Sequence, residues 1–338
     1  MSEEHFHVDP ALKLPVVDLT GLAEAADNAD AAALAPLAAA FDHACRDHGF
    51  CYIAGHGVDP ELRRQAFAMS AAFHALPLAE KQKLAINRAF RGYLAMATSV
   101  IVTSSIEKAT RPNLSESLMV MHEVEPGAPP GALDGANQWP ADLPGFRETI
   151  ADYDRALRRL GRRMMRMIAA ALGLPPTGLD AHFAHPTTFL RLLHYPPQPP
   201  DADAMQYGSA PHTDYGFITI LAQDSSGGLQ VRSREKSWID ATPIDDTFVV
   251  NIGDMGSRWS NGRWPSTPHR VVNRSGHDRY SLPYFFDPHT DTVVAPVAGC
   301  RRPGEPAMPP VRYGDYLMER IDKNYAYRKQ ASREGDRA

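Results

Sequence analysis

The chain has 338 residues, of which 43% are hydrophobic and 22% are charged, the balance of an ordinary globular protein with a substantial core. Its 35 basic and 40 acidic residues give a formal net charge of −5, which excludes a general electrostatic attraction to nucleic acid or to anionic membranes. No apolar run reaches membrane-spanning length, and the acidic start of the chain lacks the basic and apolar regions of a signal peptide, so we expect a soluble protein.

Two helices are predicted near the start of the chain. Residues 28–47 carry apolar side chains at helical spacing, and Gly49 follows them as a stop. The positions on the apolar face are Leu34, Leu37, Phe41 and Cys45. Residues 60–73 form the second predicted helix, and Pro60 opens its first turn, where the missing N–H of proline is not needed.

The longest predicted helix covers residues 146–172. Its apolar residues recur at steps of three and four, which places them on one stripe of a helix. They are Phe146, Ile150, Tyr153, Leu157, Leu160, Met164, Ile168 and Leu172. Gly173 and the pair Pro175-Pro176 end the pattern, so we expect a long amphipathic helix that packs against the core.

After residue 187 the pattern changes to short runs that are rich in β-branched and aromatic residues and separated by turn residues. The predicted strands are 188–195, 217–222, 228–232, 238–241, 247–252, 269–273 and 280–286. Short strands at this spacing are typical of a sandwich or barrel. Residues 311–327 predict a C-terminal helix, and residues 328–338 are polar enough to form a loose tail. Helices and strands are thus segregated along the chain, which indicates an α+β protein.

The three cysteines, Cys45, Cys51 and Cys300, form an odd and widely spaced set. Such a set indicates reduced thiols and not a disulfide framework. We therefore expect a cytoplasmic protein.

Three His-x-Asp triplets occur in a chain that has 14 histidines. They are His7-Val-Asp9, His212-Thr-Asp214 and His289-Thr-Asp291. The first lies in a polar N-terminal segment, and the third lies among turn-forming residues with no histidine after it. The middle triplet is followed at a distance by a suitable histidine, His269, and is therefore our candidate for a metal site.

Side chains alternate between the two faces of a strand, so the first and third residues of such a triplet can reach one ion. Two imidazoles and one carboxylate hold a divalent iron on one side and leave the other side open for chemistry. We therefore predict that His212, Asp214 and His269 bind a metal ion, with iron(II) favoured. The alternative is that these residues are hydrogen-bonded polar members of the core.

Arg279 and Ser281 form a second pair at a spacing of two, at the head of a predicted strand. On one face of a strand, an arginine and a serine can bind a carboxylate by a forked ionic contact and a hydroxyl donor. An arginine that points into an apolar barrel is costly unless it is paired, so an inward Arg279 would imply an anionic ligand. The alternative is an arginine on the outer face of the strand.

These motifs resemble those of the iron(II)/2-oxoglutarate-dependent dioxygenases, specifically the isopenicillin N synthase-like branch. The core motifs are His212-Thr-Asp214, Ser266-Thr-Pro-His-Arg-Val271 and Arg279-Tyr-Ser-Leu-Pro283. Similar segments in the second half are Leu190-Arg-Leu-Leu-His-Tyr-Pro196, Gly227-Gly-Leu-Gln-Val231, Asn251-Ile-Gly-Asp-Met255 and Trp259-Ser-Asn-Gly262. In the first half they are Leu14-Pro-Val-Val-Asp-Leu19, His48-Gly-Phe-Cys-Tyr-Ile53, Gly55-His-Gly57, Arg91-Gly-Tyr93 and Asn137-Gln-Trp-Pro140.

The resemblance implies a double-stranded β-helix, or jelly roll, with flanking helices. It divides the chain into an N-terminal α/β region at residues 1–120, a linker and scaffold helix at 121–186, an iron-binding jelly-roll core at 187–300, and a C-terminal helix and tail at 301–338. These parts are expected to form one compact structural unit.

The resemblance also implies the co-substrates of the site. We expect 2-oxoglutarate to place its distal carboxylate at Arg279 and Ser281 with Tyr195 beside it, O2 to be the oxidant, and ascorbate to act as a stimulating reductant. Leu193 stands where plant members of the family often have asparagine, so an amide contact to the co-substrate is missing at this position.

Three residues lie where relatives place groups that face the substrate, namely Arg91, Tyr93 and Phe285. The resemblance is poorest over residues 95–108, an apolar and β-branched segment. This segment either carries substrate specificity, as variable loops commonly do, or forms a strand or helix on the barrel. Asn251 and Asp254 are interpreted as residues that set a turn.

The implied reaction is oxidation of a small molecule, by default hydroxylation, with release of succinate and CO2; desaturation or ring closure is reachable from the same chemistry. Family association places the substrate in natural-product metabolism. One alternative is an iron oxidase of the same fold that does not use 2-oxoglutarate. Another is a non-catalytic protein with a metal-organised pocket, or a zinc hydrolase with the same three ligands. The identity of the substrate and the oligomeric state stay open.

Overall fold

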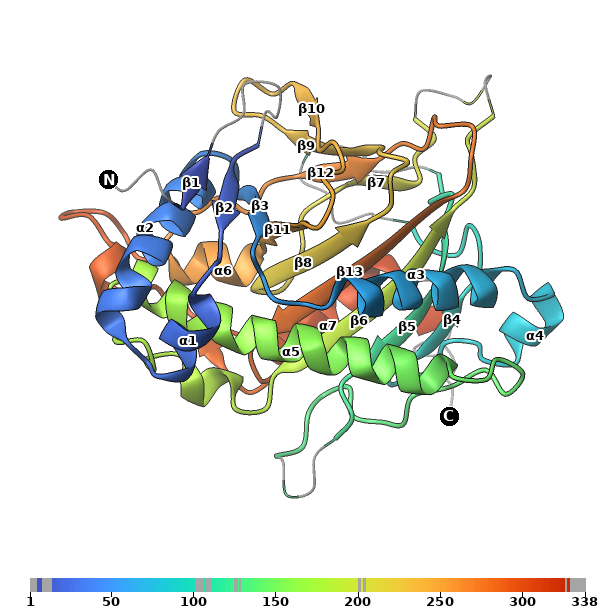
Figure 1. The fold of residues 1–338 in the computed structure, drawn as a ribbon, viewed down its shortest axis with the longest axis horizontal. Coiled ribbons are helices and arrows are strands. Elements are labelled where there is room, and N and C mark those ends of the chain that lie inside the picture. Colours follow the sequence, from blue (N-terminus) through green and yellow to red (C-terminus); the bar gives the residue numbers. More distant parts are fainter. Residues whose placement is uncertain are drawn as a thin grey trace.

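The computed structural model describes residues 5–7, 14–100, 106, 111–124, 127, 129–199, 202, 205–325, 327 and 328 (Figure 1). Much of segment 95–108, for which a specificity role and a strand or helix on the barrel were the two alternatives, lies outside the described residues. Part of the first His-x-Asp triplet and the predicted tail from residue 329 onward do so too.

The described helices are α1 (Leu22–Asp27), α2 (Ala31–His48), α3 (Pro60–His74), α4 (Leu78–Gln82), α5 (Phe146–Ala171), α6 (Asp254–Trp259) and α7 (Tyr313–Asn324), with 3-10 turns at Asp180–Phe183 and Ala298–Cys300. Among the described residues, α2, α3, α5 and α7 lie where the four helices were predicted, and α1, α4 and α6 are short helices that were not predicted. Within the described ranges, each helix is too short or too polar to cross a lipid bilayer.

The strands before the core are β1 (Phe6–His7), β2 (Val16–Asp18), β3 (Phe50–Ala54), β4 (Gly92–Leu94) and β5 (Glu116–Met121). Those of the core are β6 (Thr187–Tyr195), β7 (Ser209–His212), β8 (Ile218–Gln223), β9 (Leu229–Arg232), β10 (Trp238–Asp240), β11 (Phe248–Ile252), β12 (His269–Val271) and β13 (Arg279–Asp287). The last two are β14 (Val293–Val294) and β15 (Val311–Arg312), which pair with each other.

Two sheets face each other and form the jelly roll. The large sheet has the strand order β1-β2-β3-β11-β8-β13-β6-β5-β4, and the smaller sheet, at the top of Figure 1, has the order β10-β9-β12-β7. Their neighbouring strands are antiparallel except for the parallel pair β2 and β3. The buried cluster between the sheets consists of Leu14, Phe50, Tyr52, Leu193, Tyr195, Leu221, Leu229, Val231, Ile239, Ala241, Val249 and Val271. The predicted α+β jelly roll with flanking helices is therefore confirmed.

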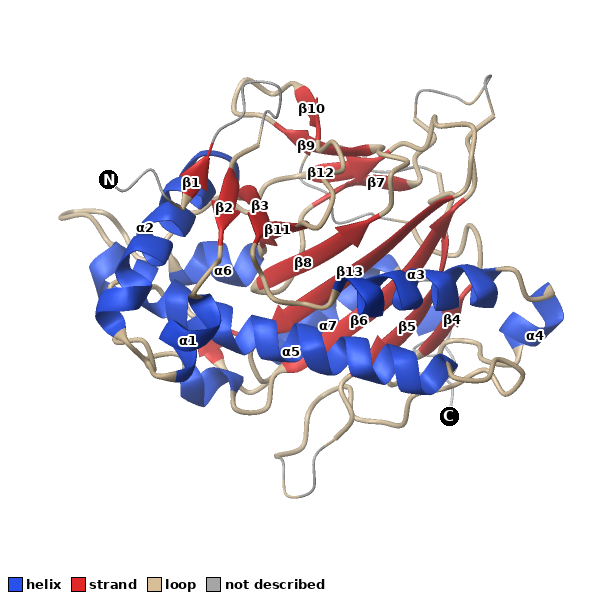
Figure 2. Ribbon diagram, in the orientation of Figure 1, coloured by secondary structure: helices blue, strands red, loops and turns tan. Residues whose placement is uncertain are grey.

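Helices cover the other face of the large sheet (Figure 2). The long helix α5 contacts α1, α2 and α3 and reaches β13. Gly161 lies in the middle of α5 because the helix approaches β13 closely there: a Cβ on this residue would be 2.6 Å from the ring of Phe286. The predicted amphipathic stripe of residues 146–172 is confirmed, since its apolar side chains are buried in the core that α5 shares with the sheet.

The ends of α2 are set by two side-chain features. Asp30 caps the start, because its carboxylate accepts the backbone N–H groups of Ala32 at 2.9 Å and Ala33 at 3.1 Å. The helix ends at Gly49, whose φ of 63° suits glycine, and a Cβ there would be 2.1 Å from the carbonyl oxygen of Pro265. The predicted stop is confirmed, and it lets the chain pass close to the segment that leads into β12.

The C-terminal helix is shorter than predicted. It occupies Tyr313–Asn324, because residues 311 and 312 pair with β14 as a strand. The division of the chain into four parts remains a prediction, although β3 of the N-terminal region pairs directly with β11 of the core.

Candidate active site

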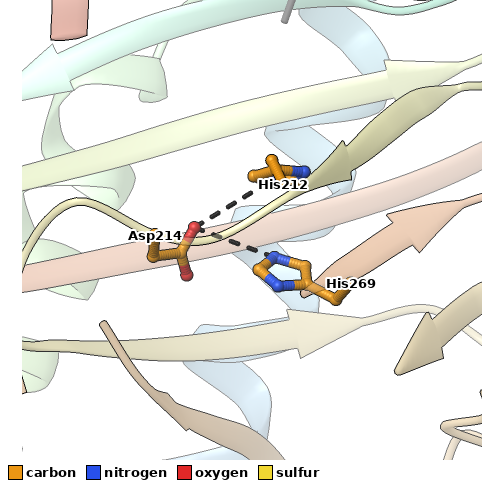
Figure 3. A group of neighbouring side chains, drawn as sticks. All are labelled: His212, Asp214 and His269. Carbon is orange, nitrogen blue, oxygen red and sulfur yellow. Dashed lines mark ion pairs between the residues drawn. The ribbon is translucent and has the colours of Figure 1, made fainter. Parts of the chain in front are cut away.

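The predicted metal-binding residues come together at the end of the jelly roll (Figure 3). His212 is the last residue of β7 and lies directly opposite His269, the first residue of β12. One ligand atom from each of His212, Asp214 and His269 lies within 4.8 Å of the others, and the carboxylate oxygen Oδ1 is 3.8 Å and 3.7 Å from the two Nε2 atoms.

The prediction that His212 and Asp214 lie on one face of a single strand is wrong. Strand β7 ends at His212, and Asp214 lies in the turn that leads to β8. The turn, and not the alternation of a strand, therefore brings the carboxylate to the imidazoles.

Both imidazoles are oriented by backbone carbonyl groups. Nδ1–H of His212 donates to the carbonyl of Ala210 at 2.8 Å, and Nδ1–H of His269 donates to the carbonyl of Thr267 at 3.3 Å. With the proton on Nδ1, each Nε2 keeps its lone pair for a metal ion. The fixed tautomer is what a histidine ligand requires.

Burial and mutual charge set the protonation states. Burial, followed by repulsion from His269, lowers the pKa of His212 and favours its neutral form. Burial alone would raise the pKa of Asp214, but attraction to His269 and His212 and two side-chain hydrogen bonds outweigh it and lower the pKa. Neutral imidazole and ionised carboxylate are the metal-binding forms. The donor set thus fits iron(II) in both chemistry and charge.

Arg279 is buried, which excludes the alternative of an outer-face arginine. It is 1% exposed, its Nε–H donates to the carbonyl of Gly227 at 2.6 Å, and its guanidinium carbon is 4.8 Å from the centre of the Tyr195 ring. Both terminal nitrogens are buried without a hydrogen-bond partner among the described residues. A buried and unpaired cation of this kind is the feature expected of an anion site.

Ser281 lies two residues further along β13 and is also buried. Arg279 is directly opposite Tyr195 on β6, and Ser281 is opposite Leu193. The two predicted partners of a carboxylate therefore share one face of β13 with Tyr195 beside them, on the jelly-roll side of the sheet.

A cavity of about 100 Å³ opens beside the triad. It is bounded by His212 and Asp214, by other polar side chains that include Asn113 and Asp287, and by apolar side chains from three strands, from α7 and from two loops. The apolar members are Phe90, Val100, Met119, Phe189, Phe285, Leu317 and Ile321. Space of this kind next to a metal site is where a small molecule would bind.

One of the three predicted substrate residues lines this cavity. Phe285 does so from β13, while Arg91 and Tyr93 lie outside its lining. Arg91 is fully buried and donates to the carbonyl groups of Ala89, Leu133 and His122. The hydroxyl of Tyr93 donates to Glu116, so this hydroxyl and the two terminal nitrogens of Arg91 are used within the fold.

Arg191 was not predicted, yet it lines the cavity beside the triad. Its Nε–H donates to the hydroxyl of Ser117 at 2.9 Å, and within the described ranges no carboxylate forms an ion pair with it. Strand alternation could have found this residue, because Arg191 is four residues before Tyr195 on β6 and so faces the same side.

Helix α7 forms one wall of the cavity and is tied to the barrel by tyrosines. The hydroxyl of Tyr313 donates to Asp287 at 2.6 Å, and the hydroxyl of Tyr316 donates to Asp254 at 2.6 Å. Asp287 also accepts the backbone N–H of Phe217 at 2.6 Å. These contacts fix the C-terminal helix against β13 and α6.

Family models match both halves of the chain. Residues 186–288 match the 2OG-Fe(II) oxygenase superfamily, and residues 14–142 match the model described as non-haem dioxygenase in morphine synthesis N-terminal. The first match spans the segments that carry His212, Asp214, His269, Arg279 and Ser281.

Individual proteins are similar over nearly the whole length. The 2-oxoglutarate-Fe(II) type oxidoreductase hxnY of Emericella nidulans is 35% identical, with 89% of each chain covered. A homoarginine-6-hydroxylase of Oryza sativa subsp. japonica is 36% identical over 84% of this chain and 88% of its own. The crystal structure of full-length Neurospora crassa T7H with alpha-KG and thymine has a TM-score of 0.80 at 31% identity and covers 94% of this chain and 98% of that one. The chain belongs to the 2OG-Fe(II) oxygenase superfamily and is an iron(II)- and 2-oxoglutarate-dependent oxidoreductase.

Proposed function

We propose that His212, Asp214 and His269 hold the iron(II) through the two Nε2 atoms and the carboxylate. The convergence of these atoms within 4.8 Å supports this assignment, as do the carbonyl groups that fix both imidazoles with Nε2 toward the carboxylate. Three protein ligands leave positions on the ion for small molecules, which a closed structural site would not do.

The second part of the proposal assigns the 2-oxoglutarate contacts. Arg279 receives the distal carboxylate through its two terminal nitrogens, Ser281 donates its hydroxyl, and the ring of Tyr195 covers the guanidinium. The unpaired and buried guanidinium is the observation that carries this assignment. A forked arginine contact both neutralises the carboxylate and fixes its orientation.

The third part concerns the reaction. Bound iron(II), with 2-oxoglutarate and O2, supplies an oxidant that attacks a C–H bond, while 2-oxoglutarate leaves as succinate and CO2. Hydroxylation of a small molecule is the outcome that we propose. The residues of this chain hold the substrate beside the triad, with Phe285 as an apolar surface and Arg191 as a donor to an anionic or oxygen-rich group.

The names of similar proteins support a small polar or aromatic substrate. One relative is named as a hydroxylase of homoarginine, and one similar structure contains thymine. The name of the matching N-terminal family model refers to morphine synthesis, which supports a place in natural-product metabolism. The proposal includes a cytoplasmic enzyme that binds neither nucleic acid nor membrane, consistent with the net charge of −5.

Succinate formation tests the reaction. Purified enzyme with iron(II), O2 and 2-oxoglutarate is offered pools of small metabolites, and ascorbate is added as a reductant. We expect one pool to accelerate succinate release together with loss of one component and gain of an oxygenated product. Oxidation of a component at full rate without 2-oxoglutarate would instead support the oxidase of the same fold.

A spectroscopic experiment tests the metal ligands without needing the substrate. Under anaerobic conditions, iron(II) and 2-oxoglutarate together should give a weak visible charge-transfer band. The band should disappear in Asp214→Ala, which removes the anionic ligand. Asp291→Ala is the matched control, because Asp291 belongs to the similar triplet His289-Thr-Asp291 and its side chain is 51% exposed. Equal bands in both variants would contradict the assignment of Asp214.

A further inference from the structure

The two oxygens of Asp214 have different surroundings. Oδ2 accepts the hydroxyl of Thr219 at 2.5 Å and the side-chain amide of Asn251 at 2.7 Å. Oδ1 faces the imidazoles and is 3.8 Å from Nε2 of His212 and 3.7 Å from Nε2 of His269. The two oxygens therefore have different roles: Oδ2 is held by hydrogen bonds within the protein, and Oδ1 is directed to the metal position.

The two donors are built into neighbouring strands. Thr219 on β8 and Asn251 on β11 are direct partners across the ladder, so their side chains stand side by side on one face. They are 4% and 3% exposed, and Asp214 is 7% exposed. Buried donors at this distance from an ionised acceptor form strong contacts, because water cannot compete for them.

The main chain of Asp214 is held from the same side. The backbone N–H of Asp254 donates to the carbonyl of Asp214 at 2.8 Å. Gly253 allows this approach, since a Cβ there would be 2.3 Å from the carbonyl oxygen of Gly216 and 3.1 Å from that of Asp214. The segment from Asn251 to Asp254 thus supports Asp214 by both its side chain and its backbone, which goes beyond setting a turn.

We propose that Thr219 and Asn251 are positioning residues that keep Asp214 as a ligand through Oδ1 alone. This inference rests on the proposed iron site. A carboxylate can bind a cation through one or both oxygens, and the second mode occupies a further position on the ion. By holding Oδ2, the two donors preserve the positions that the co-substrate needs, and they orient Oδ1 before the metal arrives.

Cobalt(II) binding to the metal-free enzyme tests the inference without turnover. Thr219→Val removes the hydroxyl at nearly constant volume, and Asn251→Leu removes the amide donor. We expect each variant to bind cobalt(II) about 10-fold more weakly, the usual scale for losing an outer contact to a ligand. Their visible cobalt spectra should also change in intensity, because a carboxylate that binds through both oxygens alters the coordination number.

Two comparisons keep the result interpretable. Thr219→Ser restores a hydroxyl and should recover the affinity and the spectrum of the original chain, which a loss of packing alone would not predict. Melting of each metal-free variant shows whether it is folded; if Thr219→Val is unfolded, Asn251→Leu and Thr219→Ser decide the question. Full cobalt affinity and an unchanged spectrum in a folded Asn251→Leu would overturn the inference.

His212→Ala separates this inference from the proposed function. If His212→Ala binds cobalt(II) as tightly as the original chain, the proposed metal site itself fails. If that variant loses the metal while folded Thr219→Val and Asn251→Leu keep full affinity and spectrum, the metal site stands and only the positioning role is wrong.

Discussion

Arg191 brings a positive charge into a cavity that is lined by both apolar and polar side chains, among them the carboxylates of Asp214 and Asp287. It projects from β6 on the side that also carries Tyr195, and its one described hydrogen bond is to the hydroxyl of Ser117. A guanidinium is most useful in such a place when the substrate supplies an anionic or oxygen-rich group. If Arg279 binds 2-oxoglutarate as proposed, the two arginines of the site have separate partners.

If Arg191 binds the substrate and Arg279 binds 2-oxoglutarate, Arg191→Leu should weaken the binding of the substrate alone. Loss of a charge-assisted contact of about 2 kcal/mol should raise the KM for the substrate about 30-fold. The KM for 2-oxoglutarate should change little, because Arg279 is intact. Steady-state kinetics with each ligand varied in turn measure both constants. Arg155→Leu on the exposed face of α5 is the control, and an equal rise in both KM values would contradict these separate roles.

The residues of the site differed in how far the sequence could predict them. His212, His269, Arg279 and Ser281 could be found because motif spacing restricts where such side chains can point. Thr219 and Asn251 could not be found as partners of Asp214, because their contact depends on the register of β8 against β11, which one sequence does not reveal.

The hydrophobic periodicity of the sequence predicted helix α5 well and strand β7 poorly. A stripe repeated over many turns is a strong pattern, and α5 lies at Phe146–Ala171 as expected. Strand β7 has four residues, includes Pro211, and was not predicted. The same holds for β5, whose side chains are all buried, so that it lacks the alternation by which strands are recognised.

The close approach of α5 to β13 can be tested by adding a methyl group to Gly161. Alanine favours a helix over glycine by about 1 kcal/mol, yet the new methyl of Gly161→Ala would meet the ring of Phe286 at 2.6 Å. Overpacking costs about 1 to 3 kcal/mol, so we expect net destabilisation. Urea unfolding measures it, and Phe286→Leu in the same chain should reduce the effect of the added methyl. A more stable Gly161→Ala would show that the helix can move away.

A buried polar cluster joins the N-terminal region to the core. Glu116 on β5 accepts Lys81 Nζ–H at 2.8 Å, the hydroxyl of Tyr93, and Nδ1–H of His194 at 2.9 Å. Nε2–H of His194 donates in turn to Asp278 at 3.0 Å. Side chains from the start of the chain are thereby connected to β6 and to the residue before β13, behind the sheet that carries Arg279.

The cluster predicts a specific dependence of stability on pH. Burial opposes ionisation of Glu116, but hydrogen bonds from His194, Lys81 and Tyr93 prevail and lower its pKa from 4.5 to about 2. Its contribution is therefore present above pH 4.5 and is lost as the pH falls toward 2. Burial likewise opposes the charge on His194, but Glu116 and Asp278 raise its pKa above 6.5, so its contribution is present below pH 6.5 and is lost at higher pH.

Glu116→Gln should thus lower the free energy of unfolding most between pH 4.5 and pH 6.5, where both contributions are present. Near pH 5.5 the variant leaves Lys81 and His194 without their buried partner, and we expect a loss of about 3 kcal/mol in the free energy of unfolding. Burial lowers the pKa of the neighbouring His74 to about 4, but both chains contain this residue, so most of its effect cancels in the difference. Urea unfolding at pH 3, 5.5 and 8 measures the difference in the free energy of unfolding between the original chain and the variant. This difference should be smaller at pH 3, because the charge on Glu116 is being lost there. It should also be smaller at pH 8, because the charge on His194 is being lost there. A difference that is the same at all three pH values would mean that Glu116 stabilises the fold by packing and not by its charge.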